Sequence, residues 1–349
     1  MDRIQIELNK MKPIIKIKKN TIIIIVITFF LSLVASYLSS FSNDYKIYSD
    51  IYKNTIDQNT LNKIEPLYLL INNLFYSLGF DFSIFIFFIS FISLFIKISI
   101  LNKLTSSSFI FYLLILMYVS SLFIIHEITQ FRVSLAIAFG FLCCYKLTNY
   151  KKKESILFLI IAILFHYSAI LFSLIYIIKN GYRKLKRIDV LIMVSLFFLI
   201  PLIIKMTITI LIHLNPLFLE YYSNSNQTNS KGLLSITTLL ATTFTIINLF
   251  LLRSFYSSLH YRVFSFLNIV GLLFLIGLSF SPVLSIRIYE LFSFSSFIII
   301  SLLYNKVFSL SGNNRYSFYC IRTLLLLLFI LISLHRFIAF FIVNPILTF

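Results

Sequence analysis

The stretch from His126 to Ser168 reads HEITQFRVSLAIAFGFLCCYKLTNYKKKESILFLIIAILFHYS and combines long apolar runs with polar side chains at their ends and centres. A charged side chain in the middle of a bilayer raises the free energy by at least about 2.5–3.5 kcal/mol. Such a side chain persists where it faces a cavity or a partner. We therefore expect the rest of the chain to be arranged around this stretch.

The composition of the chain sets its broad class. Of its 349 residues, 59% are hydrophobic and 12% are charged, and the mean hydropathy is +0.96. A soluble domain carries about 25% charged residues, so a soluble fold is excluded. The sequence predicts an all-α polytopic integral membrane protein with a single transmembrane domain over residues 1–349, because the stretches between apolar runs are too short for a separate domain.

The net charge of +18 comes from short basic clusters between the apolar runs. Clusters in these positions set the orientation of a membrane protein and contact anionic headgroups, so we expect membrane lipids and no nucleic acid as partners. The basic N-terminus before the run 21–41 resembles a signal peptide. Because this run is long enough to span, we interpret it as a retained signal anchor.

Apolar runs long enough to cross a hydrocarbon layer of roughly 30 Å predict most of the helices. Together with two ambiguous segments, 65–80 and 154–178, they amount to about 10–11 transmembrane helices. The clear candidates are the runs 21–41, 82–101, 108–125, 132–149, 189–212, 232–252, 263–280, 288–304 and 321–343.

The positive-inside rule gives an orientation. With a cytoplasmic N-terminus, the basic cluster 151–153 stays inside only if 65–80 lies along or dips into the outer face. Basic clusters on both sides of 154–178 then stay inside only if this segment turns back. We therefore expect two half-helices that meet near His166 as a broken or re-entrant hairpin, with a single span as the alternative. The expected external segments are 42–81, 126–131, 213–231 and 281–287.

Two arginines begin predicted spans at the outer face. Arg132 follows the expected turn 126–131, and Arg287 precedes the run 288–304. A guanidinium keeps its charge and offers two parallel hydrogen bonds, which suits phosphate. We expect both arginines to bind an anion; the alternative is an interfacial arginine that reaches towards water.

Three carboxylates lie near these arginines and are candidates for a general base. Glu65 precedes Pro66, a pattern that is also typical of a helix start. Glu127 lies in the expected turn, where its geometry is open. Glu290 follows Arg287 by three residues, so on a helix the two share a face and could pair with each other.

His166 lies near the centre of its segment, beside the hydroxyls of Tyr167 and Ser168. A neutral imidazole donates one hydrogen bond and accepts another, so it can bind phosphate or sugar or transfer a proton. The alternative is a buried histidine that fixes the helix break.

The three cysteines show no metal-binding or disulfide pattern, because Cys143 and Cys144 are adjacent and Cys320 stands alone. We expect neither a bound metal nor a cofactor.

The pattern ITQFRVSLAIA (128–138), then KKKES (151–155), then LFLIIAILFHYSAILF (157–172) resembles the central signature of the EpsG-type polysaccharide polymerases, which are relatives of the Wzy O-antigen polymerases. In that family an arginine opens a span, and Phe-His-x-Ser-Ala follows some thirty residues later. Arg132 and His166 match these positions. The family commonly has Gln directly after the arginine, whereas here Val133 follows and Gln130 precedes, so the role of Gln130 is open.

Flanking blocks of the chain are also similar to the family's features, although each is weak on its own. The resemblance covers roughly residues 40–295. The blocks are Asp44-Tyr45, Glu65-Pro66-Leu67-Tyr68 and Arg287-Ile288-Tyr289.

The resemblance implies a type C glycosyltransferase that works at the outer face of the bacterial inner membrane. It would transfer a growing glycan from its polyprenyl-pyrophosphate carrier to another lipid-linked repeat unit, in O-antigen or exopolysaccharide synthesis, with inversion and without a metal ion. A chain-length regulator protein is a further candidate partner. The implied residues are Arg132 and Arg287 for pyrophosphate, Glu65, Glu127, Glu290 and His166 for catalysis, and Tyr68, Gln130, Tyr167, Ser168 and Tyr289 for substrate contact.

Three other classes remain as alternatives. A polysaccharide flippase or other transporter usually has about twelve spans in two related halves, and this chain shows no internal repeat. A non-catalytic membrane assembly protein would not need His166 or the external arginines. A membrane O-acyltransferase is disfavoured because no matching histidine pattern opens the chain.

Overall fold

The chain folds into helices because apolar runs of this length must satisfy their backbone hydrogen bonds internally in lipid. The computed structural model describes residues 17–53, 64–176, 206, 236–254, 258–278, 282–305 and 315–339. The elements in these residues are helices, which confirms the predicted all-α polytopic membrane fold. The long ones are α2 (Ile17–Ser39), α6 (Phe82–Leu104), α7 (Ser108–Phe123), α8 (Phe131–Thr148), α13 (Ile236–Ser254), α14 (Leu259–Gly277), α15 (Pro282–Leu303) and α16 (Arg315–Ile338).

Within the described residues, seven helices are long and apolar enough to cross a membrane. Residues 236–252 of the run 232–252 lie in α13, whose apolar part Thr238–Leu249 is shorter than a span. The run 189–212 and the expected external segment 213–231 lie outside the described residues. The seven spans match the predicted runs 21–41, 82–101, 108–125, 132–149, 263–280, 288–304 and 321–343.

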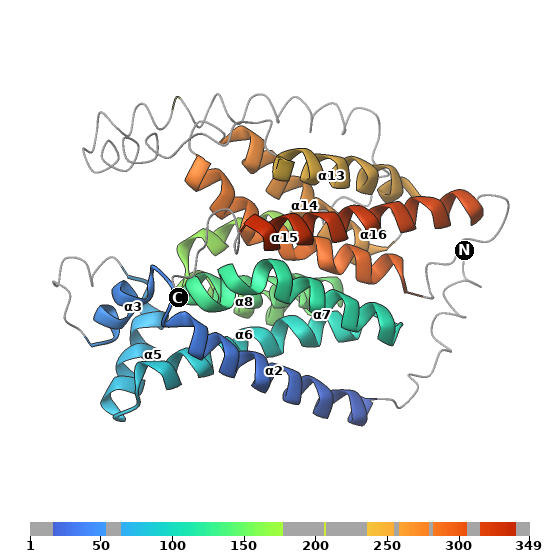
Figure 1. Ribbon diagram of the computed structural model, residues 1–349. Helices are drawn as coiled ribbons and strands as arrows, with labels where there is room; N and C mark the ends of the chain where they lie inside the picture. Colours follow the sequence, from blue (N-terminus) through green and yellow to red (C-terminus); the bar gives the residue numbers. More distant parts are fainter. Residues whose placement is uncertain are drawn as a thin grey trace.

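The long helices lie side by side as a bundle, with α2, α6, α7 and α8 in one part and α13 to α16 in the other (Figure 1). α6 packs against both α2 and α8, and α14 packs against α15. Two short helices, α3 (Tyr45–Tyr52) and α5 (Pro66–Ser77), lie together where α2 ends and α6 begins. We refer to this end of the bundle as the α3–α5 end.

The ambiguous segment 65–80 contains α5, which has 12 residues. A helix of this length extends roughly 18 Å, too short to cross a hydrocarbon layer of roughly 30 Å. The Tyr52 hydroxyl donates a hydrogen bond to the Phe80 carbonyl at 2.7 Å and ties α3 to the end of this segment. α5 therefore covers the α3–α5 end, in agreement with the interpretation from the charge pattern.

Helix replaces the turn that the sequence predicts at 126–131. α7 continues into a π-helix, η1 (Ile124–Thr129), whose six residues are all buried. The helix breaks at Gln130, with φ −119° and ψ 61°, before α8 begins. The expectation of an external turn is therefore corrected, because the carboxylate of Glu127 finds its partners, Lys97 and Tyr118, inside the bundle. Similarly, residues 282–287 of the expected segment 281–287 form the first turns of α15.

The chain after α8 forms the expected broken hairpin. α9 (Lys152–Phe165) ends where His166 takes an extended conformation, with φ −160° and ψ 123°, and a 3₁₀-helix, η2 (Tyr167–Leu174), follows. The hydroxyls of Ser155 and Tyr176 lie 2.7 Å apart. The second leg therefore returns beside the start of the first, and His166 lies at the tip.

Gly140 allows the hairpin to pack closely against α8. A Cβ atom at this position would overlap the ring of Phe172 in η2. The Phe172 ring also packs edge-on against Phe141, with ring centres 5.3 Å apart. This close packing fixes the distance between the hairpin and α8, and so the position of His166 relative to α8.

Candidate functional site

Three segments that are far apart in the sequence meet at the α3–α5 end. Glu65 is the residue before α5, Arg132 stands in the first turn of α8, and His166 is the tip of the hairpin. Each lies where a helix begins or ends, so its side chain can reach beyond a helix–helix interface. The fold thus brings together three residues that the sequence marks separately as candidates.

The carboxylate of Glu65 joins the other two residues. Its Oε2 atom accepts a hydrogen bond from Nη1 of Arg132 at 2.7 Å, and its Oε1 atom lies 2.5 Å from Nδ1 of His166. Burial raises the pKa of Glu65, but the hydrogen bond to His166 and the charge of Arg132 outweigh burial and hold the pKa below its usual range. Glu65 is therefore ionised, and Nδ1 of His166 donates to it, because a carboxylate can only accept.

The rings of two tyrosines pack against the guanidinium of Arg132. The guanidinium lies over the rings of Tyr48 and Tyr68, 5.5 Å and 5.6 Å from the ring centres. Both rings are buried, and the Tyr68 hydroxyl has no hydrogen-bond partner among the described residues. Burial raises the pKa of both hydroxyls, so they stay protonated, and Tyr68 keeps a donor for an anion.

The cluster is open on one side. The side chains of Arg132 and His166 keep 23% and 29% of their surface exposed. Arg287, an exposed residue of α15, is close enough for its charge to act on the Tyr48 hydroxyl, as the charge of Arg132 does. Arg287 therefore lies within electrostatic range of the cluster, although no hydrogen bond or ion pair joins it to Glu65, Arg132 or His166 in the described part of the chain.

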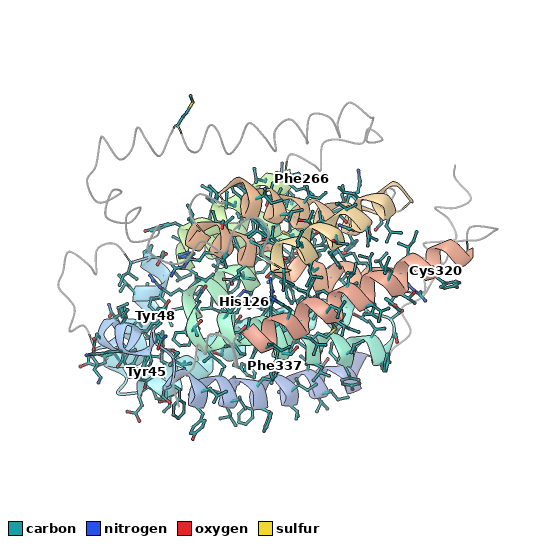
Figure 2. The ribbon with its side chains drawn as sticks, turned by 45° about the horizontal axis from the view of Figure 1, so that its top comes forward. Tyr45, Tyr48, His126, Phe266, Cys320 and Phe337 are labelled. Carbon is teal, nitrogen blue, oxygen red and sulfur yellow. The ribbon has the colours of Figure 1, made fainter. Side chains whose placement is uncertain are left out.

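Glu127 does not join this cluster. It is fully buried and pairs with Lys97 at 2.8 Å, in a network that also holds Tyr118. Its neighbour His126 lies in the interior of the bundle, and neither ring nitrogen has a hydrogen-bond partner in the described part of the chain (Figure 2). The structure therefore places Glu127 inside the bundle and not in the external turn that the sequence predicts.

Tyr289 and Glu290 have surroundings of their own. Both are buried, and the Arg336 guanidinium lies over the Tyr289 ring, 5.5 Å from its centre. Tyr289 and Arg336 line a small cavity between α7, α13, α15 and α16. Arg336 and Arg287 both act on Glu290 electrostatically, but the described residues show no ion pair between Glu290 and either arginine, so the pairing of Glu290 with Arg287 stays a prediction. Arg287 connects these surroundings to the cluster at the α3–α5 end.

The other sequence candidates adjoin the cluster through the chain. Tyr167 and Ser168 follow His166 in η2, and Tyr167 is 54% exposed. Gln130 is half-buried at the break between η1 and α8, two residues before Arg132. None of the three shares a hydrogen bond with the cluster that the described residues show, so their part in substrate contact stays a prediction.

Sequence reasoning missed Tyr48 and Lys97. Tyr48 lies in the external segment 42–81, and nothing in its neighbourhood marks it. Lys97 carries a signal, because it is a charged residue within the apolar run 82–101. A search for charges inside predicted spans finds it.

The described residues contain no group of three or more His, Cys, Asp or Glu side chains that could hold a metal ion. Three of the sequence candidates keep exposed surface near the α3–α5 end, namely the side chains of Arg132, His166 and Arg287. This arrangement can bind an anion and accept a proton from a neighbouring hydroxyl.

The comparison with known proteins covers nearly the whole chain. A model of the EpsG family matches residues 21–344, a range that includes Glu65, Arg132, His166 and Arg287. No curated protein and no solved structure matches the chain. By the extent of the family match, this multi-pass membrane protein belongs to the EpsG family.

Proposed function

We propose that this protein is a polysaccharide polymerase, a type C glycosyltransferase that joins oligosaccharide repeat units carried on polyprenyl pyrophosphate. Membership of the EpsG family supports a polymerase-like role, and the multi-pass fold supports substrates held in the membrane. The observation that carries the proposal is the cluster of Glu65, Arg132 and His166, because it combines an anion-binding group with a proton acceptor on an open face. The product is an O-antigen or exopolysaccharide chain.

Arg132 and Arg287 stabilise the leaving pyrophosphate. Negative charge develops on this group as the glycosidic bond breaks, so fixed positive charges lower the barrier. Arg132 uses one amino group for Glu65, which leaves other donors of its planar fork for phosphate oxygens. Removal of one donor of this kind typically lowers kcat by about 10²–10³-fold.

We assign the general base to His166. In the neutral imidazole whose proton lies on Nδ1 and is donated to Glu65, the lone pair of Nε2 can accept the proton of the acceptor hydroxyl. Both oxygens of Glu65 are occupied, so Glu65 orients the other two residues and compensates the imidazolium charge that forms. Glu127 and Glu290, which the sequence also suggests as bases, are buried.

The reaction is a single displacement. The acceptor hydroxyl oxygen attacks the anomeric carbon of the donor, its proton moves to Nε2 of His166, and the bond from that carbon to the pyrophosphate oxygen breaks. Attack from the side opposite the leaving group inverts the anomeric configuration. The proposal needs no metal or cofactor, because the arginines supply the positive charge.

We place the site at the outer face of a bacterial cytoplasmic membrane, where both lipid-linked substrates are accessible. The positive-inside rule puts Lys152 in the cytoplasm, and α9 runs from Lys152 to the α3–α5 end. A chain-length regulator protein is a candidate partner at the same face.

Cysteine accessibility tests this placement in a background without native cysteines. Lys151→Cys and Asn180→Cys should both react with an impermeant reagent from the cytoplasmic side, and Tyr167→Cys from the outer side. Reaction of positions 151 and 180 from opposite sides would contradict the hairpin and invert the orientation after it.

The test of function supplies the purified protein with a radiolabelled lipid-linked repeat unit. Chain extension is expected, and Arg132→Ala and Arg287→Ala should insert normally but give glycan capped at a single repeat. Arg322→Ala is a matched control, because Arg322 lies over the rings of Tyr304 and Tyr319, 4.2 Å and 4.8 Å from their centres, away from the cluster. Glycan chains of normal length in both site variants would contradict the proposal.

The alternatives give different results in the same assay. A flippase or transporter would move the lipid-linked unit across vesicles without extending it. A non-catalytic assembly protein would show no extension when purified, and its cellular role would survive replacement of Arg132, Arg287 and His166.

A further inference from the structure

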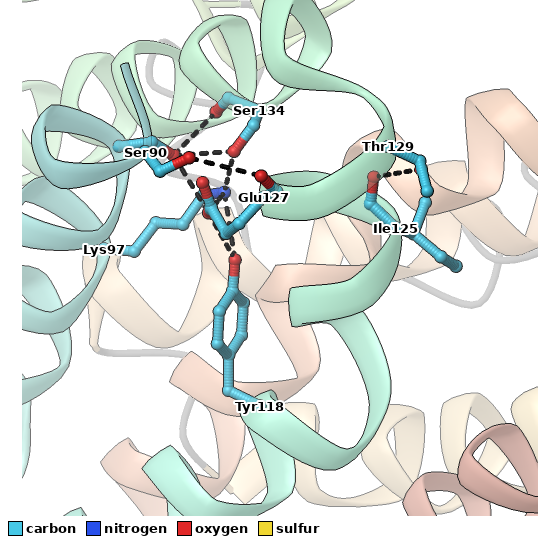
Figure 3. A network of polar contacts seen from close by, with 8 residues as sticks. Ser90, Lys97, Tyr118, Ile125, Glu127, Thr129 and Ser134 are labelled. Carbon is cyan, nitrogen blue, oxygen red and sulfur yellow. Dashed lines mark hydrogen bonds and ion pairs between the residues drawn. The ribbon is translucent and has the colours of Figure 1, made fainter. Parts of the chain in front are cut away.

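A second group of polar side chains lies inside the bundle around Lys97 of α6 (Figure 3). Its Nζ atom donates to Oε1 of Glu127 at 2.8 Å, to Oγ of Ser134 at 2.8 Å and to the Tyr118 hydroxyl at 3.1 Å. A lysine ammonium has three hydrogens, so every donor of Lys97 is used. We refer to Lys97, Glu127, Ser134, Tyr118 and Ser93 as the buried network.

The hydrogen bonds of the buried network close into a ring. Since Ser134 accepts from Lys97, its own hydrogen is free for Ser93, whose oxygen lies 2.7 Å away. Ser93 then donates to Glu127 at 3.1 Å, and so does the Tyr118 hydroxyl at 2.8 Å. The ring therefore ties together four elements, α6, α7, η1 and α8.

Stability alone does not explain this network. A buried ion pair can often be replaced by apolar residues without loss of stability, because its desolvation offsets its attraction. The apolar surroundings of a membrane span make such a pair a candidate for a functional role. The π-helix that carries Glu127 points the same way, since π-helical turns are frequent at functional sites.

The buried network contacts the start of α8 on the side opposite to Arg132. Glu127 and Ser134 lie on either side of the break at Gln130, and Lys97 binds both. Ser134 follows Arg132 by two residues, a rotation of about 200° on a helix, so the two side chains leave α8 on opposite sides. Lys97 thus donates a hydrogen bond to one side of the first turn, while Arg132 projects from the other side to Glu65.

We propose that Lys97, Glu127 and Ser134 are positioning residues that hold Arg132 at the angle and depth needed to bind the leaving pyrophosphate. The proposal rests on the function assigned above to Arg132. The position of a guanidinium at a helix end depends on how firmly that end is fixed. A misplacement of about 1 Å can lower a rate by about 10²-fold.

Two variants test the positioning role without leaving a lone buried charge. Lys97→Met/Glu127→Met removes both ions, and Ser134→Ala removes only the link to α8, so the milder variant keeps the test valid if the double variant does not fold. The purified proteins are assayed for elongation of a radiolabelled lipid-linked repeat and for inhibition by inorganic pyrophosphate. We expect a fall in kcat of about 10²-fold for the double variant, a smaller fall for Ser134→Ala, and weaker pyrophosphate inhibition in both.

Lys146→Met/Glu154→Met is the matched control. Lys146 and Glu154 also form an ion pair that involves α8, at 2.5 Å, but the pair is partly exposed and lies at the other end of the helix. Its kcat and its inhibition by pyrophosphate should equal those of the wild type. Unchanged kcat and inhibition in Ser134→Ala, or equal losses in the control, would overturn the proposal.

A double-mutant cycle with Arg132→Lys separates the two proposals. If the network acts through Arg132, Ser134→Ala should reduce kcat much less in the Arg132→Lys background than in the wild type. If the two losses multiply instead, positioning is wrong while the function of Arg132 stands. If Arg132→Lys leaves kcat and pyrophosphate inhibition unchanged, the proposed function itself fails.

Discussion

Two buried or partly buried ion pairs lie close to the start of α8, and they differ in what they leave unused. The pair Glu65–Arg132 has a 2.7 Å contact, but Arg132 stays 23% exposed and its Nε atom has no partner among the described residues. The pair Lys97–Glu127 has a 2.8 Å contact, is fully buried, and has every hydrogen of Lys97 engaged. The first pair keeps donors for a ligand, and the second keeps none.

The choice of cation fits this difference. Arginine presents several donors in one plane, so one edge can bind a protein carboxylate while the rest binds phosphate. Lysine is a compact charge with three donors, and three neighbouring oxygens saturate it. We refer to Glu65–Arg132 as the open pair and to Lys97–Glu127 as the closed pair. The open pair is suited to binding a ligand, and the closed pair is suited to fixing the position of a helix.

The largest expected effect concerns the open pair. His166→Ala should lower the elongation rate by about 10²–10⁴-fold, because it removes the proposed proton acceptor. Elongation of a radiolabelled lipid-linked repeat measures this, with thermal unfolding recorded on the same preparation. His260→Ala is the control, since His260 is also a half-buried histidine beside an aromatic ring, that of Tyr145. Equal losses of rate in both variants would contradict the assignment.

The next effect concerns the closed pair. Glu127→Ala leaves the ammonium of Lys97 buried without its carboxylate, so we expect the free energy of unfolding to fall by about 3–5 kcal/mol. Glu65→Ala should lower it less, because Arg132 is partly exposed to water. Denaturant unfolding of the purified proteins measures both. If Glu127→Ala were as stable as the wild type, the contrast between the pairs would disappear.

A moderate effect is expected where the hairpin meets α8. Gly140→Ala places a methyl group against the buried Phe172 ring, so the free energy of unfolding should fall by about 1–3 kcal/mol. The elongation rate should also fall, because a displaced hairpin carries His166 away from Glu65. Gly79→Ala is a useful contrast, since its added methyl group would meet no neighbouring atom but its φ of +75° disfavours alanine. It should affect stability without changing the rate.

The smallest effect is a pH dependence of the open pair. The pKa of Glu65 is lowered in the folded protein, so its carboxylate contributes stability above its unfolded pKa of about 4.3. This contribution is lost as the pH falls through the lowered, folded pKa. Between about pH 5 and pH 3 the wild type should therefore lose more stability than Glu65→Gln. Parallel curves of unfolding temperature against pH for the two proteins would contradict the ion pair.

The spans and the hairpin could be predicted because their causes are local. A run of about twenty apolar residues predicts a span by its length alone. The basic residues on both sides of 154–178 predict that the chain turns back within this segment, and the contact between the Ser155 and Tyr176 hydroxyls brings the second leg beside the start of the first. Arg132 and His166 could be marked one by one, since each is a polar residue within or at the end of an apolar run, and Glu65 could be marked as a carboxylate of an expected external segment.

Their meeting could not be predicted, because it depends on packing between distant segments. Glu65 and His166 are 101 residues apart in the chain, and no local pattern relates them. The helical form of residues 126–129 could not be predicted for a similar reason, since Glu127 looks like a turn residue until Lys97, 30 residues earlier, supplies its partner. A carboxylate that looks external in the sequence thus becomes internal through one tertiary contact.

The length of α9 determines the distance between the start of the hairpin and His166 at its tip. The helix supplies 14 residues before His166, and each added residue would advance the tip by about 1.5 Å and turn it by about 100°. One inserted residue would swing the imidazole away from Glu65. Seven, close to two full turns, would restore its direction but shift it by roughly 10 Å. The number of residues in this one short helix therefore sets how far His166, the proposed proton acceptor, stands from the start of the hairpin.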